Sequence, residues 1–246
     1  LFANSPFNEN KLSGFLSYRG KVWQETNRGG IMSIAFEKVN FEKYIDYAIN
    51  YPILFLKKKG KYFSPNGQTF KDFLDGSLNF LKGEKPSLED FENHLGTIFT
   101  EIRLKQVIEF RSLDTCNFGC ICNGPSFFTG LIYGSLDETY EIIKNWKKEE
   151  VMDAYLNAPK QGLNTLLKNK KLIDWAKIFL DISKKGLDKR NELNKSGKNE
   201  TIYLKHVEEI IKNKKTRAEI LIEQYNKTNN LNFLVNHEEN FSYSGF

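Results

Sequence analysis

The sequence predicts an α+β fold with two portions, residues 1–134 and residues 135–246. Up to residue 134, short alternating segments with glycine-rich turns are mixed with short amphipathic helices, which is typical of α+β proteins rather than of regular βαβ repeats. In the second portion, apolar residues recur almost wholly at helical spacing. The chain has 246 residues, 40% of them hydrophobic, which is enough to bury a substantial core.

The first portion is expected to begin with extended segments. The stretch GFLSYRGKVW at 14–23 is expected to be extended and to end in the turn NRGG at 27–30. In FEKYIDYAIN at 41–50, the apolar residues fall at helical spacing. YPILFLKKKGKYF at 51–63 is expected to form a hairpin that turns at Gly60.

Capping signals mark the next two helices. Thr69 is expected to cap FKDFLDG at 70–76. Ser87, with Asp90 three residues later, resembles a capping box that opens LEDFENHLGTIF at 88–99. These local signals place both helix starts.

After the cysteine-containing segment, the chain is expected to be almost wholly helical. Thr216 and Glu219 form another capping box. The periodic segments lie at 127–133, 136–146, 147–157, 171–194, 201–214 and 217–227.

Composition limits the classes of function. No run of about 18 apolar residues is present, so no membrane segment is expected. The formal charge of +5 comes mostly from lysines spread along helix faces, and nucleic-acid binding would need denser clustering, so none is expected.

The cysteines and one histidine have structural interpretations. Cys116, Cys120 and Cys122 lie within seven residues, which is unlike a secreted disulfide framework and predicts a reducing, cytoplasmic location. Three thiols without a nearby histidine do not complete a structural zinc site, so packing or free thiols are expected. His94 lies inside a predicted helix and is expected to be a structural hydrogen-bonding group.

A charged strand is the main candidate for chemistry. VIEFRSLD at 107–114 alternates like a strand, and the alternation continues upstream through EIRLKQ. One face then collects Arg103, Lys105, Glu109 and Arg111. The plain interpretation is a solvated sheet face with paired charges. The alternative is a site for a nucleotide triphosphate with its cation, because guanidinium groups bind phosphate and a carboxylate binds Mg²⁺.

The opposite face favours the second interpretation. Its residues are apolar, which predicts a central strand packed on helices. They are Ile102, Leu104, Ile108 and Phe110.

Several motifs in order resemble the plant and proteobacterial type of glutamate–cysteine ligase. They are LFANSPF, GFLSYRGKVW, YIDYAINYPILF, TFKDFLDG, FENHLGTIFTEIRLKQVIEFRSLD and PSFFTGLIYG. The resemblance covers residues 1–134 closely and the helical remainder loosely. It implies a fold related to glutamine synthetase: a curved antiparallel sheet with outer helices, followed by the helical portion. Family members carry a further segment ahead of LFANSPF, so the chain is expected to be a C-terminal fragment with little or no activity alone.

The resemblance also implies a reaction. ATP would phosphorylate the γ-carboxylate of glutamate, and the amine of cysteine would attack the acyl phosphate, the first step of glutathione biosynthesis. The implied partners are glutamate, cysteine, ATP and Mg²⁺, for a monomer or a homodimer. Two alternatives stay open: a related carboxylate–amine ligase with another amine acceptor, and an inactive binding or structural domain on the same scaffold.

The family motifs carry over residue by residue. On the charged strand, the resemblance implies that Glu109 is a metal ligand, that Arg111 faces the transferred phosphoryl group, and that Arg103 and Lys105 bind nucleotide phosphates.

Upstream, Arg19 of LSYRGKVW matches an arginine that holds a substrate carboxylate, and Asn4 and Ser5 of LFANSPF lie near that pocket. The chain departs from the family at QETNRGG, after the tryptophan.

Overall fold

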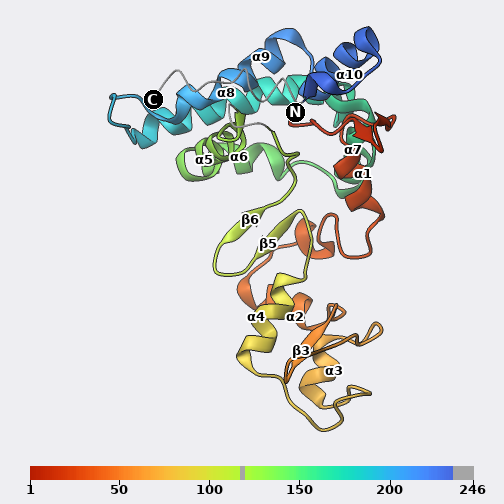
Figure 1. Cartoon of the computed structure of the whole chain (residues 1–246). Helices are drawn as coiled ribbons and strands as arrows, with labels where there is room; N and C mark the ends of the chain where they lie inside the picture. Colours follow the sequence, from red (N-terminus) through yellow and green to blue (C-terminus); the bar gives the residue numbers. More distant parts are fainter. Residues whose placement is uncertain (117–119, 235–246) are drawn as a thin grey trace. The chain divides into compact units, whose positions relative to one another are not determined.

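The computed structural model describes residues 1–116 and 120–234, and it confirms the predicted α+β class (Figure 1). Helices dominate, and the strands of these residues pair as four antiparallel two-stranded hairpins. None of the described helices is long and apolar enough to cross a membrane. The curved sheet implied by the family resemblance stays a proposal, because the described strands do not join into one sheet.

The chain divides into two compact units. Unit 1 comprises Leu1–Val22 and Leu113–Phe246, and unit 2 comprises Trp23–Ser112. These units are defined by compactness, whereas the division expected after residue 134 separates a sheet-containing portion from a helical one. The expected division therefore stays a prediction.

Unit 2 contains the first predicted helix and hairpin. Helix α2 (Phe41–Ile49) begins after Asn40, whose side chain accepts a hydrogen bond from a first-turn amide. Strands β3 (Leu56–Lys58) and β4 (Lys61–Phe63) turn at Lys59 and Gly60, which both have positive φ, as a two-residue hairpin turn requires. A short 3₁₀ helix, η1 (Ser33–Phe36), precedes α2.

The two predicted capping residues are confirmed. Helix α3 (Phe70–Asp75) begins at a capping box formed by Thr69, and α4 (Leu88–Gly96) begins at one formed by Ser87. These helices and β3 enclose the core of unit 2. Its buried residues are Ile53, Leu56, Phe70, Phe73 and Leu78.

The charged strand is a hairpin, so the prediction of one central strand is wrong. Strands β5 (Ile102–Leu104) and β6 (Ile108–Phe110) pair antiparallel, and the chain reverses between them. The apolar side chains of Ile102, Ile108 and Phe110 are exposed instead of packed on helices. The continuous alternation hid the reversal, because a three-residue turn keeps odd and even residues on their own faces.

Unit 1 begins with a small hairpin and a helix. Strands β1 (Phe7–Asn8) and β2 (Lys11–Leu12) pair, and α1 (Tyr18–Glu25) follows. The prediction that residues 14–23 are extended is therefore wrong for its second half. The sequence of α1 lacks an amphipathic pattern, so periodicity did not predict this helix. Every residue of α1 is at least partly exposed.

The helical portion matches the predicted segments with shifted bounds. The helices and small elements are α5 (Asn123–Thr129), the π-helix η3 (Gly130–Gly134), α6 (Leu136–Ile143), α7 (Lys148–Gln161), the 3₁₀ helix η4 (Gly162–Asn164), the hairpin β7 (Leu166–Leu167) with β8 (Lys170–Lys171), α8 (Leu172–Arg190), the 3₁₀ helix η5 (Glu200–Leu204), α9 (Lys205–Asn213) and α10 (Arg217–Thr228). The Thr216 and Glu219 capping box is confirmed. The β7–β8 hairpin was not predicted.

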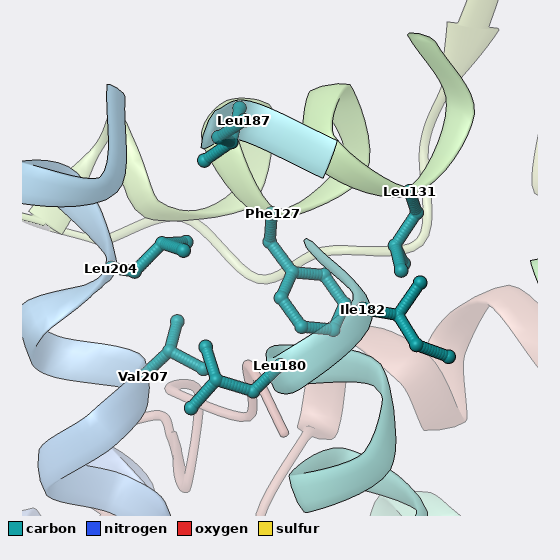
Figure 2. Packing of buried hydrophobic residues seen from close by; sticks show 7 residues of the cluster. All are labelled: Phe127, Leu131, Leu180, Ile182, Leu187, Leu204 and Val207. Carbon is teal, nitrogen blue, oxygen red and sulfur yellow. The ribbon is translucent and has the colours of Figure 1, made fainter. Parts of the chain in front are cut away.

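The main core of unit 1 lies between α5, η3, α8, η5 and α9. Figure 2 shows the Phe127 ring among aliphatic side chains of these elements. The buried cluster consists of Phe127, Leu131, Leu180, Ile182, Leu187, Leu204 and Val207.

One cysteine prediction is wrong. Cys116 and Cys120 form a disulfide, with a Cα–Cα distance of 6.0 Å, whereas packing or free thiols were expected. Cys122 is a free cysteine, as expected.

Candidate active site

The charged face of the β5–β6 hairpin brings two arginines onto one carboxylate. Arg103 and Glu109 lie directly opposite each other in the ladder. The Glu109 Oε2 atom accepts a hydrogen bond from Arg103 Nε at 2.7 Å and lies 2.6 Å from Arg103 Nη2. The other carboxylate oxygen, Oε1, lies 3.3 Å from Arg111 Nη1. Arg103 Nη1 also donates to the Gly96 carbonyl at the end of α4, at 2.5 Å. The sequence therefore predicted correctly that these three side chains share a face.

Two aromatic rings flank the second arginine. The Arg111 guanidinium carbon lies 5.7 Å from the Trp23 ring centroid and 5.5 Å from that of Phe99, and the two rings lie 6.0 Å apart. Cation–π contacts of this kind hold a guanidinium in place without consuming its hydrogen-bond donors. Sequence reasoning missed Phe99, because nothing in the local pattern links it to a residue twelve positions later.

The arrangement suits an anion better than a metal. Both arginine side chains are largely buried, at 12% and 17% exposure, whereas the carboxylate of Glu109 is 40% exposed. Within residues 1–116 and 120–234, no three histidine, cysteine or acidic side chains come together to hold a metal ion. Since Mg²⁺ prefers several oxygen ligands, Glu109 alone does not form a metal site here. Lys105 lies in the exposed turn of the hairpin.

A second group of predicted residues lies in unit 1. Asn4 donates from its backbone to Asp114 Oδ2 at 2.8 Å, and its side-chain amide donates to the Thr115 carbonyl at 2.9 Å. The Ser5 hydroxyl donates to the same Asp114 oxygen at 2.7 Å and accepts the Arg19 amide at 3.1 Å. The structure thus brings Asn4, Ser5 and the backbone of Arg19 together around Asp114. The sequence analysis did not include Asp114 among the site residues, because its partners lie 97 to 110 residues away.

A cavity of about 260 Å³ adjoins this group. Phe2, Asn4, Asp114, Asn123 and Arg217 are among its lining residues. The side-chain oxygen of Asn4 is buried and accepts no hydrogen bond from the described part of the chain. Burial lowers the pKa of Arg217, although it stays cationic at physiological pH.

His94 is structural, as expected. It is buried, its Nε2 lies 2.8 Å from the Ala48 carbonyl oxygen, and its ring stacks on Phe70 at 4.9 Å. Burial lowers the pKa of His94, which therefore stays neutral at pH 7.

The family model of glutamate-cysteine ligase family 2 (GCS2) matches residues 1–237. The chain belongs to this family. The match covers both the charged hairpin and the Asp114 group, so both lie in a GCS2 chain.

Three relatives give the same result. The GCS2 chain is 39% identical to the chloroplastic glutamate–cysteine ligase of Solanum lycopersicum over 230 residues, and 39% identical to that of Arabidopsis thaliana over 231 residues. It is 37% identical to the chloroplastic glutamate–cysteine ligase A of Oryza sativa subsp. indica. Each match covers 92% of this chain but only 43% of the first two relatives and 46% of the third. The chain therefore spans less than half the length of these proteins.

These relatives correct one expectation. The predicted cytoplasmic location is wrong, because the relatives are named as chloroplastic enzymes. The clustered cysteines indicated a reducing compartment and carried no information about an organelle.

Proposed function

We propose that this GCS2 chain forms part of a glutamate–cysteine ligase. The enzyme would join the γ-carboxylate of L-glutamate to the amine of L-cysteine through γ-glutamyl phosphate, with ATP as the phosphoryl donor. This reaction is the first step of glutathione biosynthesis. Besides the family match, the observation that carries the proposal is the pair of guanidinium groups converging on one face of the β5–β6 hairpin.

The hairpin supplies charge for phosphoryl transfer. A γ-carboxylate oxygen of glutamate attacks the γ-phosphorus of ATP and ADP leaves, so negative charge spreads over the phosphoryl oxygens. Arg111, flanked by its two rings, would meet that charge, and Arg103 and Lys105 would bind the nucleotide phosphates. The cysteine nitrogen then attacks the acyl carbon and phosphate leaves.

The Asp114 group is proposed to bind glutamate. Arg19 would hold a carboxylate of glutamate with its guanidinium fork. The unused side-chain oxygen of Asn4 is available to accept a hydrogen bond from an ammonium group. The Ser5 hydroxyl already bonds Asp114 and the Arg19 amide, which indicates a supporting role.

Three further features are part of the proposal. Mg²⁺ would accompany ATP, with Glu109 as one ligand and the others from outside the described residues. The exposed apolar face of the β5–β6 hairpin, including Ile108 at 61% exposure, supports its joining a larger curved sheet of the whole enzyme. The names of the relatives point to a plastid.

A chimeric enzyme tests the function. The 246-residue chain would replace the matching part of the Solanum lycopersicum relative, and phosphate release from ATP would be measured with glutamate and different amines. We expect turnover with cysteine or 2-aminobutyrate and none with unrelated amines. Equal turnover with unrelated amines would indicate a different amine acceptor, and no turnover would favour an inactive scaffold.

Two variants of the chimera test the hairpin. Arg111→Ala and Glu109→Gln should each abolish turnover without unfolding the protein. Lys61→Ala, which removes an exposed lysine from the β3–β4 hairpin, should leave turnover unchanged. Normal turnover in the first two variants would remove both residues from the site.

A further inference from the structure

Asp114 accepts hydrogen bonds from two distant segments. Its Oδ2 atom accepts from the Asn4 amide at 2.8 Å and from the Ser5 hydroxyl at 2.7 Å. Its Oδ1 atom accepts from the Ser17 hydroxyl at 2.8 Å. Each carboxylate oxygen is therefore committed to a donor, and the carboxylate joins LFANSPF to LSYRGKVW.

Both serine hydroxyls pass this contact on to helix α1. The Ser5 hydroxyl accepts the Arg19 amide at 3.1 Å, and the Ser17 hydroxyl accepts the Gly20 amide at 3.0 Å. These are two of the first-turn amides that lack partners inside a helix. Two chains of hydrogen bonds, which we call relays, thus link the Asp114 carboxylate to two successive amides of α1: one through Ser5 to Arg19, and one through Ser17 to Gly20.

The anchor is one of several polar contacts at the start of α1. The Leu16 and Ser17 amides also donate to the Pro159 carbonyl, and the Tyr18 amide donates to the Ser5 carbonyl. Every residue of the eight-residue helix is at least partly exposed, so no buried apolar face fixes its position. Isolated helices of this length are marginal in water. A carboxylate near the helix N-terminus also has a favourable interaction with the helix dipole. The polar contacts of its N-terminus, with those of Asp114 among them, therefore hold the first turn of α1 in place.

We propose that Asp114 is a positioning residue for Asn4, Ser5 and Arg19, the residues proposed to bind glutamate. By fixing the first turn of α1, it sets the backbone from which the Arg19 side chain extends, and it holds Asn4 and Ser5 beside it. The position of α1 follows from the contacts alone. The consequence for glutamate binding rests on the proposed function, because that is where Arg19 has its role.

Asp114→Asn is the informative change. An amide has one oxygen, whereas the native carboxylate accepts at both ends. If the amide oxygen faces Ser17, the amide nitrogen faces the Asn4 N–H, and two donors oppose each other. The substitution keeps the size of the side chain but removes its negative charge and one of its two acceptor oxygens, so the charge-assisted hydrogen bonds are lost. Asp188→Asn is the matched control, since Asp188 accepts a side-chain hydrogen bond from Asn199 on the surface of the same unit.

Amide hydrogen exchange in the 246-residue chain tests the position of α1. We expect the Arg19 and Gly20 amides to exchange about ten- to a hundredfold faster in Asp114→Asn, because charge-assisted hydrogen bonds are lost. The amides of α8 should be unchanged, and Asp188→Asn should match the wild type. Should Asp114→Asn unfold, Ser17→Ala is the second variant, and faster exchange of Gly20 alone is expected. Unchanged exchange at both amides overturns the proposal.

Kinetics of the chimera test the consequence for substrate. Asp114→Asn should raise the KM for glutamate about tenfold or more, and leave the KM for ATP and kcat within about twofold. A general loss of folded enzyme would instead lower kcat and leave both KM values unchanged, and that result overturns the positioning role. An inactive wild-type chimera counts against the proposed function, while hydrogen exchange still decides whether Asp114 fixes α1.

Discussion

Removing the charge of Glu109 should have little effect on the stability of the fold. Its carboxylate is 40% exposed, and a glutamine oxygen can still accept from the largely buried Arg103, so the loss of folding free energy should be small. We therefore expect Glu109→Gln to change the free energy of unfolding by less than about 1 kcal/mol, measured by urea denaturation. Asp90→Asn is a useful comparison, because that side chain is buried and bonds both Lys58 and Ser87. A larger loss in Glu109→Gln than in Asp90→Asn would contradict this assignment.

His94 should make stability depend on pH. Burial lowers its folded-state pKa below the ordinary value of 6.5, so below about pH 6.5 the unfolded state takes up a proton that the folded state does not. Stability should fall as the pH drops through this range, by at most about 1.4 kcal/mol per pH unit, and level off below the folded pKa. Above about pH 7, His94 should add no pH dependence.

Urea unfolding of the wild type and His94→Gln at pH 5.5 and 7.5 measures this effect. Glutamine can still donate a hydrogen bond to the Ala48 carbonyl but does not titrate, so the variant should lose part of the pH dependence. His206→Gln, at a partly exposed position on α9, is the control. An identical pH dependence in His94→Gln and wild type would contradict the prediction.

At the scale of elements, local signals were predictable and distant partners were not. The helix caps at Thr69, Ser87 and Thr216 involve residues three apart, and all three caps are confirmed. Helix α1 was missed because its N-terminus is anchored by Ser5 and Asp114, which are far away in sequence. The shared face of the charged hairpin was predicted, because alternation survives the turn.

No residue type in the turn between β5 and β6 indicated that the chain reverses there. The residues between β5 and β6, Lys105, Gln106 and Val107, include none of the glycine, asparagine or proline residues that usually mark turns. The hairpin at Lys59 and Gly60, by contrast, has a glycine and was found. Turn chemistry therefore decided which hairpin the sequence revealed.

The close contact between η3 and α8 should not tolerate a side chain. A Cβ atom at Gly134 would overlap the Gly186 backbone, including its carbonyl group. Because both partners are backbone, neither can rotate away. We expect Gly134→Ala to lower the free energy of unfolding by about 1–3 kcal/mol or more, measured by urea denaturation.

Gly96→Ala is the matched control for this contact. Gly96 is the last residue of α4, and a Cβ atom there would meet only the Lys105 Nζ atom at 3.7 Å, an ordinary contact. The substitution should be neutral or slightly stabilising, since alanine favours helix. Equal effects of the two substitutions would show that the η3–α8 contact is looser than the structure indicates.

At the scale of the whole molecule, the proposed ligase activity would draw on groups beyond the arginine pair and the Asp114 group. The arginine pair and the Asp114 group are present, yet no three histidine, cysteine or acidic side chains of the described residues converge on one point. Phosphoryl transfer from ATP needs metal ions to neutralise the phosphates. The relatives are more than twice as long, so they contain residues that can supply such ligands.

We therefore expect the 246-residue chain alone to show little or no turnover of ATP with glutamate and cysteine, and the chimera with the Solanum lycopersicum relative to be active. Phosphate release at equal protein concentrations measures both, with the Arg111→Ala chimera as the background. On the proposed function, Glu109 would be a single ligand of the Mg²⁺ that accompanies ATP, so phosphoryl transfer by the chain alone should stall before the acyl phosphate forms. Turnover by the chain alone at the rate of the chimera would show that its own residues complete the metal site.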